Sequence, residues 1–208
     1  MVVIGFVAIT AVATALSWYF GGLGGDALRL AESADRTDRL KAVDMLRHRT
    51  DQAALDALFR LCSDGDLRVA VTAVWAIGEI RTQSSGELLA RVLCDKGRHG
   101  RIRGEAAESL GRFKDIAPTV LTDALARDGD WRVRAGAARG LRHLRKVKTM
   151  GSLFRALSDS RQEVRREVIQ TMNTMMVRRF GYHPELPADK QPRVMGEIEA
   201  HLKQANVL

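Results

Sequence analysis

Apolar and polar residues alternate along most of the chain with the period of a helix that is buried on one face. One pattern occurs five times at intervals of 31 to 33 residues, with core-type residues four and eight positions after an origin residue. Positions i, i+4 and i+8 lie on one face of an α-helix, so each copy predicts a helix with a buried stripe. The five predicted stripes are Asp38, Ala42 and Leu46; Val69, Ala73 and Ile77; Ile102, Ala106 and Leu110; Val133, Ala137 and Leu141; and Val164, Val168 and Met172.

A second set of apolar-periodic segments lies between these copies and predicts the partner helices of a repeat. Each segment ends at a glycine, aspartate or serine, residues that stop one helix and cap the next. A helix pair of about thirty residues cannot bury its own apolar face, so the pairs must stack on each other. The predicted fold class is all-α: an α-solenoid of about five helical hairpins plus one N-terminal hydrophobic helix. Aromatic residues make up only 5% of the chain, which suits helices packed through alanine and leucine, and glycine and proline are expected in the short connections.

The turn before each striped helix carries a second recurring motif. Asp66 stands three residues before Val69, Asp130 stands three residues before Val133, and arginine follows the origin residue at 103, 134 and 165. In this D-x-x-V-R pattern, repeated over roughly residues 30–178, the sequence resembles the HEAT-repeat family, specifically the short bacterial HEAT-like repeats of the phycobilisome-lyase type. The resemblance implies a structural ladder of arginines paired with turn aspartates, whose members here are Asp66, Arg103, Asp130, Arg134 and Arg165.

The N-terminal segment has no charged residue before Asp26 and is long enough to cross a bilayer as a helix. We therefore expect a transmembrane anchor at 1–20, a glycine-rich linker at 21–25 and a repeat domain at 26–208, whose last unit is irregular with a loop at 181–192. A cleaved signal peptide and a buried core helix remain alternatives. Basic residues follow the segment, which predicts a single-pass protein with a cytoplasmic repeat domain. The expected anchor residues are Val2, Ile4, Phe6, Trp18, Tyr19 and Phe20.

Candidate chemistry is sparse. The five histidines lack a paired carboxylate or cysteine nucleophile, and no phosphate-binding, nucleophile-elbow or zinc-protease motif occurs, so the sequence predicts no catalytic residue, metal ligand or cofactor. Cys62 and Cys94 are expected to be buried thiols, which favours a reducing compartment. The expected function is non-enzymatic, and a phycobilin-lyase-like or regulatory enzyme subunit is the alternative that the resemblance implies.

The formal net charge of +8 calls for an acidic partner or an anionic membrane. HEAT-like repeats are expected to line a concave surface with the striped helices, and positions opposite each stripe carry Trp75 and several basic residues. Glu79 and Glu108 interrupt the basic residues, so nucleic-acid binding is the weaker alternative. Trp75 could anchor a protein interface or pack between repeats. The predicted function is a membrane-tethered scaffold that holds an acidic protein partner, with anionic lipid as a further ligand, and the predicted partner-binding residues are Val71, Trp75, Arg112, Arg139, Arg142 and His143.

Overall fold

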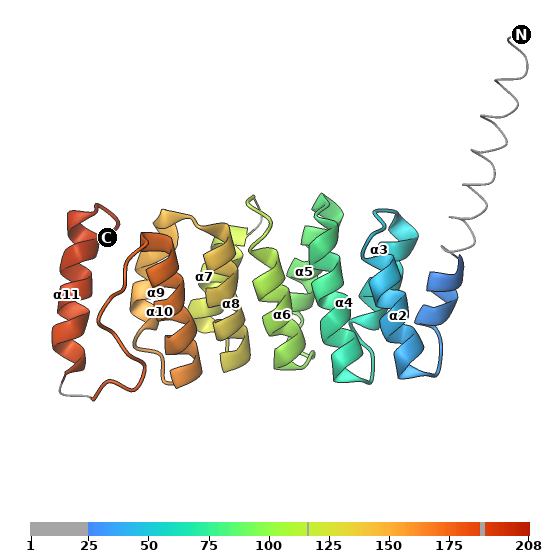
Figure 1. The fold of residues 1–208 in the computed structure, drawn as a ribbon, viewed down its shortest axis with the longest axis horizontal. Coiled ribbons are helices and arrows are strands. Elements are labelled where there is room, and N and C mark those ends of the chain that lie inside the picture. Colours follow the sequence, from blue (N-terminus) through green and yellow to red (C-terminus); the bar gives the residue numbers. More distant parts are fainter. Residues whose placement is uncertain (1–24, 116, 188–189) are drawn as a thin grey trace, which may run out of the picture. The chain divides into compact units, whose positions relative to one another are not determined.

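The computed structural model of the protein describes residues 25–115, 117–187 and 190–208 (Figure 1). The predicted anchor at 1–20 lies outside these residues, as does most of the predicted linker. Within the part that is described, no helix combines the length and the apolar character needed to span a bilayer. All regular structure in this part is helical, as the apolar pattern predicts.

The chain divides into two compact units, and the division falls between Ala76 and Ile77, within one helix. In the first unit residues 25–31 are helical and are followed by α2 (Arg36–Leu46), α3 (Gln52–Leu61) and most of α4 (Leu67–Ile80). The second unit contains α5 (Gln83–Cys94), α6 (Gly100–Leu110), α7 (Ala117–Arg127), α8 (Trp131–Leu144), the 3₁₀ helix η1 (Val147–Thr149), α9 (Met150–Ala156), α10 (Gln162–Met176) and α11 (Gln191–Gln204).

The predicted stripes form the core. Helices α2, α4, α6, α8 and α10, called the V-R helices below, carry the five copies of the pattern. All ten residues at the fourth and eighth positions after an origin residue have no exposed surface. The register of the repeat is therefore confirmed for every copy.

Short polar turns set where the V-R helices begin. Asp35 accepts hydrogen bonds from the amides of Thr37 and Asp38 at the start of α2. Asp130 accepts one from the Arg132 amide at 2.8 Å at the start of α8. Such side chains satisfy amides that have no partner inside the helix, which is why aspartate recurs in these turns.

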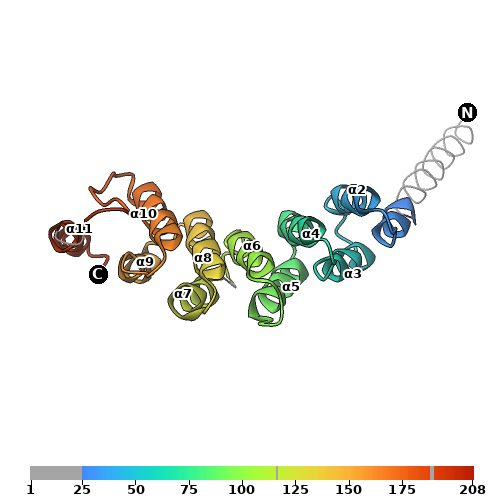
Figure 2. The same ribbon diagram turned by 90° about the horizontal axis from the view of Figure 1, so that it is seen from below.

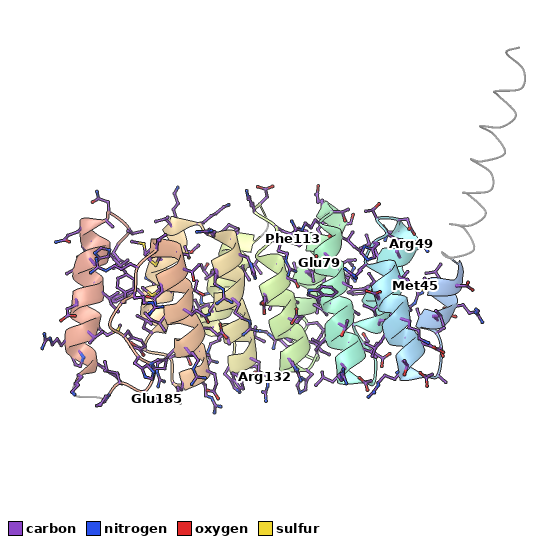
Figure 3. All side chains as sticks on the ribbon, in the orientation of Figure 1. Met45, Arg49, Glu79, Phe113, Arg132 and Glu185 are labelled. Atoms are coloured by element: carbon purple, nitrogen blue, oxygen red, sulfur yellow. The ribbon has the colours of Figure 1, made fainter. Side chains whose placement is uncertain are left out.

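In the second unit α6, α8 and α10 form one layer, and α5, α7 and α9 form the other (Figure 2). Arg132 at the start of α8 and Phe113 just after α6 lie at opposite edges of this unit, so α6 and α8 run in the same direction (Figure 3). Each helix of a pair packs on its partner and on the next pair, which buries the stripe between layers.

Helices α6 and α8 approach each other at glycines that lie inside the helices. A β-carbon on Gly104 would stand 2.6 Å from the carbonyl oxygen of Arg132, and one on Gly136 would collide with the Gly104 backbone. A β-carbon on Gly140 would likewise collide with the Ala107 carbonyl oxygen. The expectation that glycines lie in the connections is therefore wrong for these positions, where the missing side chain allows the two backbones to touch.

The last pair is irregular. Helix α10 ends at Met176, Val177 takes a left-handed conformation with φ of 49°, and α11 begins only at Gln191. The chain between them descends beside α10 before α11 rises (Figure 1). Ile198 and Leu202 of α11 are buried, so this helix covers the end of the core.

The two cysteines differ. Cys62 is buried and its thiol donates to the Leu58 carbonyl. Cys94 is exposed, so the prediction of two buried thiols is wrong for this residue. It is the last residue of α5, where the helix leaves the packed layer.

Candidate protein-binding surface

An arginine follows every origin residue except Val69, and three of these arginines join neighbouring turns. Arg39 makes two hydrogen bonds with Asp64, at 2.6 and 3.0 Å. Arg134 holds Asp159 in the same way, at 2.7 and 3.0 Å. The buried Arg103 pairs with the buried Asp128. Bidentate arginine–carboxylate pairs of this kind fix the distance between consecutive turns.

The aspartates of this ladder are not those chosen from the sequence. Asp66 and Asp130 stand two residues after the ladder aspartates Asp64 and Asp128, and their carboxylates cap α4 and α8. The capping position turns their oxygens toward the amides of the helix, away from the ladder arginines. Asp66 also pairs with the exposed Arg36 at 3.5 Å.

Hydrogen bonding lowers the pKa of two ladder carboxyls, Asp128 and Asp159. Burial alone would raise the pKa of Asp128, but hydrogen bonds from Lys96, the Asp130 amide and Arg103 outweigh it and leave the pKa below its usual value. Asp159 behaves alike, because burial is outweighed by the hydrogen bonds from Arg134 and from the Arg161 amide. Both groups are therefore charged at neutral pH and contribute to stability as anions.

Arg165, the last predicted ladder residue, has a different partner. It donates to the carbonyl oxygen of Pro184 at 2.8 Å and to those of Asp159 and Ser160. In place of a turn aspartate it therefore holds the irregular segment that follows α10.

Val71 and Trp75, both predicted to bind a partner, belong to the first unit and are partly exposed. The guanidinium of Arg47 lies over the ring of Trp75, 5.4 Å from its centre. This cation–π contact uses one side of the indole within the unit and leaves part of the ring accessible. The Trp75 side chain thus packs on Arg47 and still exposes part of its ring. From the sequence, packing between repeats and binding of a partner were alternative roles for it.

The four predicted basic residues of the second unit come together through glutamates. Arg139 contacts Glu108 at 2.5 Å and Glu167 at 3.5 Å. Arg142 reaches Glu167 at 3.7 Å. Arg112 contacts Glu79 at 3.3 Å, and His143 contacts Glu108 at 3.9 Å. We call these contacts together the glutamate–arginine network.

This network connects successive V-R helices and neutralises the face between them. Burial would lower the pKa of Arg139, but the hydrogen bond and charge of Glu108 raise it overall. The pKa of His143 is lowered, first by burial and then by the charge of Arg112. The arginines are therefore positive, the histidine is neutral at pH 7, and the glutamates balance most of the charge.

The basic run that continues beyond the network is exposed. Arg145, Lys146 and Lys148 follow the end of α8, and Lys146 donates to the Lys114 carbonyl at 2.6 Å. Cations at this position complement the negative end of the helix dipole. They are the part of the run that remains accessible to an acidic partner.

A cleft of about 790 Å³, formed by α10 and the segment after it, was not predicted from the sequence. Its lining contains three arginines and a histidine without a carboxylate, namely Arg166, Arg178, Arg179 and His183. Arg178, Arg179 and His183 follow the last copy of the repeat, where the periodic pattern stops. The basic pair at 178–179 was the only signal in the sequence.

Within the described residues no three histidine, cysteine, aspartate or glutamate side chains gather in a way that could hold a metal ion.

This arrangement of stacked helix pairs defines an all-helical repeat solenoid. A family model described as HEAT repeats matches residues 27–111, 71–142 and 118–187. The matches together span most of the chain, which therefore belongs to the HEAT-repeat family. They do not test the phycobilisome-lyase subtype.

Two solved structures are similar to the chain. A designed armadillo repeat protein shares 15% sequence identity with a TM-score of 0.46, covering 86% of this chain and 90% of that one. An engineered protein shares 20% identity with a TM-score of 0.46, covering 82% of this chain and 84% of that one. No curated protein matches the chain.

Proposed function

We propose that this protein is a non-enzymatic, membrane-tethered adaptor that binds another protein through the outward face of its V-R helices, as an accessory subunit of a larger membrane assembly. HEAT repeats commonly mediate protein–protein interaction, which supports the binding part of the proposal. The uncharged sequence before Asp26 supports the tether.

The observation that carries the proposal is the glutamate–arginine network. Its side chains are held by partners on neighbouring helices, so a binding protein would meet a polar surface that is already ordered. Preorganised side chains lose little entropy on binding, which favours specific recognition. A nucleic-acid groove needs cations free to neutralise phosphates, and here the glutamates occupy them.

Trp75 supplies an apolar contact in the first unit, and it provides the test of partner binding. Detergent-solubilised full chain is used to purify its partner, and retention is compared with that of Trp75→Ala. We expect the variant to retain less partner, with a loss of about 2 kcal/mol in binding free energy, since a partly exposed tryptophan is a frequent interface anchor. Trp131→Ala is the matched control, because Trp131 also lies under arginines, at 4.8 and 5.2 Å.

Equal losses in the two tryptophan variants would indicate a general effect on the repeats and count against an interface at Trp75. Salt-sensitive binding to random duplex DNA that is unchanged in Trp75→Ala would replace the adaptor proposal by nucleic-acid binding.

The tether is tested separately by fractionation of the full chain and of a chain that begins at Asp26. The full chain should remain with membranes after a carbonate wash and the shortened chain should not. Release of the full chain, or a mature N-terminus that begins after Ala15, would contradict the tether.

A further inference from the structure

The cleft beside α10 differs in charge from the rest of the V-R layer. Arg178 and Arg179 form no ion pair with any residue that the structure describes. Arg166 approaches Glu185 only at 4.0 Å, and both of these side chains are more than half exposed. An exposed ion pair at that distance contributes almost no free energy and does not hold the two side chains together. The cleft therefore keeps a positive potential, which the glutamate–arginine network lacks.

The wall of the cleft is fixed in place although it has no regular structure. Its backbone is held by the Asn173 side chain, which accepts from the Phe180 amide at 2.9 Å, and by Arg165, which donates to Pro184. The Tyr182 hydroxyl donates to the Leu157 carbonyl at 2.8 Å in the interior. The basic side chains therefore project from an anchored support, which lowers the entropic cost of binding.

Val177 adds an apolar contact at the rim. Its side chain is 87% exposed, the highest value among the large apolar residues that the structure describes. It also holds a left-handed backbone conformation, φ 49°, which a β-branched residue adopts only at a cost. The same end of α8 carries Arg145 in this conformation. Arg81 after α4 has it too, so this conformation ends helices in the fold, whereas an apolar side chain left exposed among arginines is not needed to end a helix.

We propose that this cleft binds an acidic segment of the partner protein, with carboxylates on Arg178 and Arg179 and an aliphatic side chain against Val177 and Ile169. The proposal rests on the proposed adaptor function and names the chemistry of the bound segment. Arginines bind carboxylates through paired N–H donors, and an apolar contact beside them distinguishes a peptide from a simple anion.

The apolar part of the lining favours a peptide over a phosphate-bearing ligand. Ile169, Tyr182 and Pro184 lie in the cleft with the cations. A phosphate or a lipid headgroup would use the arginines but leave this surface unoccupied. A segment in which acidic residues flank a leucine would fill both parts.

The test uses the full chain in neutral detergent and a short fluorescent peptide in which glutamates flank a leucine, with a photo-crosslinking group. Anisotropy reports affinity, and mass spectrometry of the crosslinked protein reports the site. We expect crosslinks within residues 166–184 and binding that weakens as salt is added. The same peptide with glutamine for glutamate should bind at least about tenfold more weakly.

Arg179→Glu is the decisive variant, because Arg179 has no ion pair within the described residues and its loss should not disturb the fold. It should reduce the affinity for the glutamate peptide by about tenfold or more. Arg127→Glu, the same charge change on an exposed residue of α7, should leave the affinity within about twofold. Unchanged thermal melting of both variants confirms that each is folded.

Equal affinity of wild type and Arg179→Glu for the glutamate peptide, or crosslinks elsewhere, would overturn the inference. So would absent peptide binding together with Arg179-dependent binding of inorganic phosphate or of phosphatidylserine vesicles, which would identify an anion or lipid site. If partner retention depends on Trp75 but the peptide does not bind, the adaptor function stands and only the proposed role of the cleft is wrong.

Discussion

Two parts of the second unit use arginine in opposite ways. On the outward face of α8 the arginines meet glutamates of the neighbouring helices, as Arg139 does between Glu108 of α6 and Glu167 of α10. In the cleft beside α10, Arg178 and Arg179 meet no carboxylate among the described residues. The residue type is the same, and the difference lies in what the next repeat supplies.

The difference follows from position in the stack. A V-R helix in the middle receives glutamates from the helix on either side, so its cations become part of the scaffold. Among the described residues no V-R helix follows α10. The segment after it contributes Arg178, Arg179 and His183, and its Glu185 lies 4.0 Å from Arg166. The end of a repeat array is therefore where charge remains free for binding.

The buried ladder should give the largest effect on the scaffold side of this comparison. Asp128→Ala leaves the buried Arg103 without its counter-ion, which should cost about 4 kcal/mol of unfolding free energy. Urea denaturation measures the loss. Glu197→Ala, which removes an exposed pair with Arg193, is the control and should change stability by less than about 0.5 kcal/mol.

The same variant has a pH signature. The pKa of Asp128 is lower in the folded chain than when unfolded, so its contribution is present above about pH 4 and is lost as the pH falls through the folded pKa. Stability of the wild type should therefore decline more steeply below about pH 4 than that of Asp128→Ala. Parallel acid titrations would contradict a stabilising role for this carboxylate.

Backbone contact between α6 and α8 gives the next effect. Gly136→Ala places a β-carbon against the Gly104 carbonyl, where only backbone could move, and should cost about 3 kcal/mol. Gly181→Ala, in the cleft wall, meets nothing within 4 Å and should change stability by less than about 0.5 kcal/mol. Thermal melting of both variants tests this contrast, which fails if the two melt alike.

Removing a glutamate should make the neutral face resemble the cleft. Glu167→Gln leaves Arg139 and Arg142 with less compensating charge and should cost about 1 kcal/mol, because the group is only partly buried. The labelled glutamate peptide should then also crosslink near Arg139. Glu199→Gln, which weakens a pair with the exposed Lys203 inside α11, is the control that should do neither.

The smallest effect tests the cleft for strain. Val177→Gly relieves a left-handed conformation but adds chain flexibility, so stability should rise by about 0.5 kcal/mol. Affinity for the leucine-containing peptide should fall in the same variant. A valine kept only for folding would give the opposite sign of stability change.

The sequence was sufficient for the parts of the fold that repeat. The buried positions from Ala42 to Met172 followed from helical geometry, because each copy of the pattern supports the others. The sequence was insufficient for contacts that depend on which way a side chain points in the folded turn. Asp64 and Asp66 stand two residues apart, and only the path of the turn decides which faces the arginine and which caps the helix.

The candidate site was predicted in part. Arg139 was placed on the outward face and Arg142 was predicted to bind beside it, but Glu167 lies outside the outward positions and was not predicted as their partner. The cleft could not be predicted because residues 177–190 have no period from which to extrapolate. Val71 and Trp75 remain predicted binding residues.

The close approach of α6 and α8 also bears on how the chain folds. In a linear array of repeats, stability is the sum of local terms and neighbour interfaces, so the tightest interface holds the longest. We expect amides of α6 and α8 to exchange with solvent most slowly, while protection declines toward α10 and α11. The segment that would contact a partner is then the part that unfolds locally most often. Partner binding would stabilise the repeat array at its least stable end.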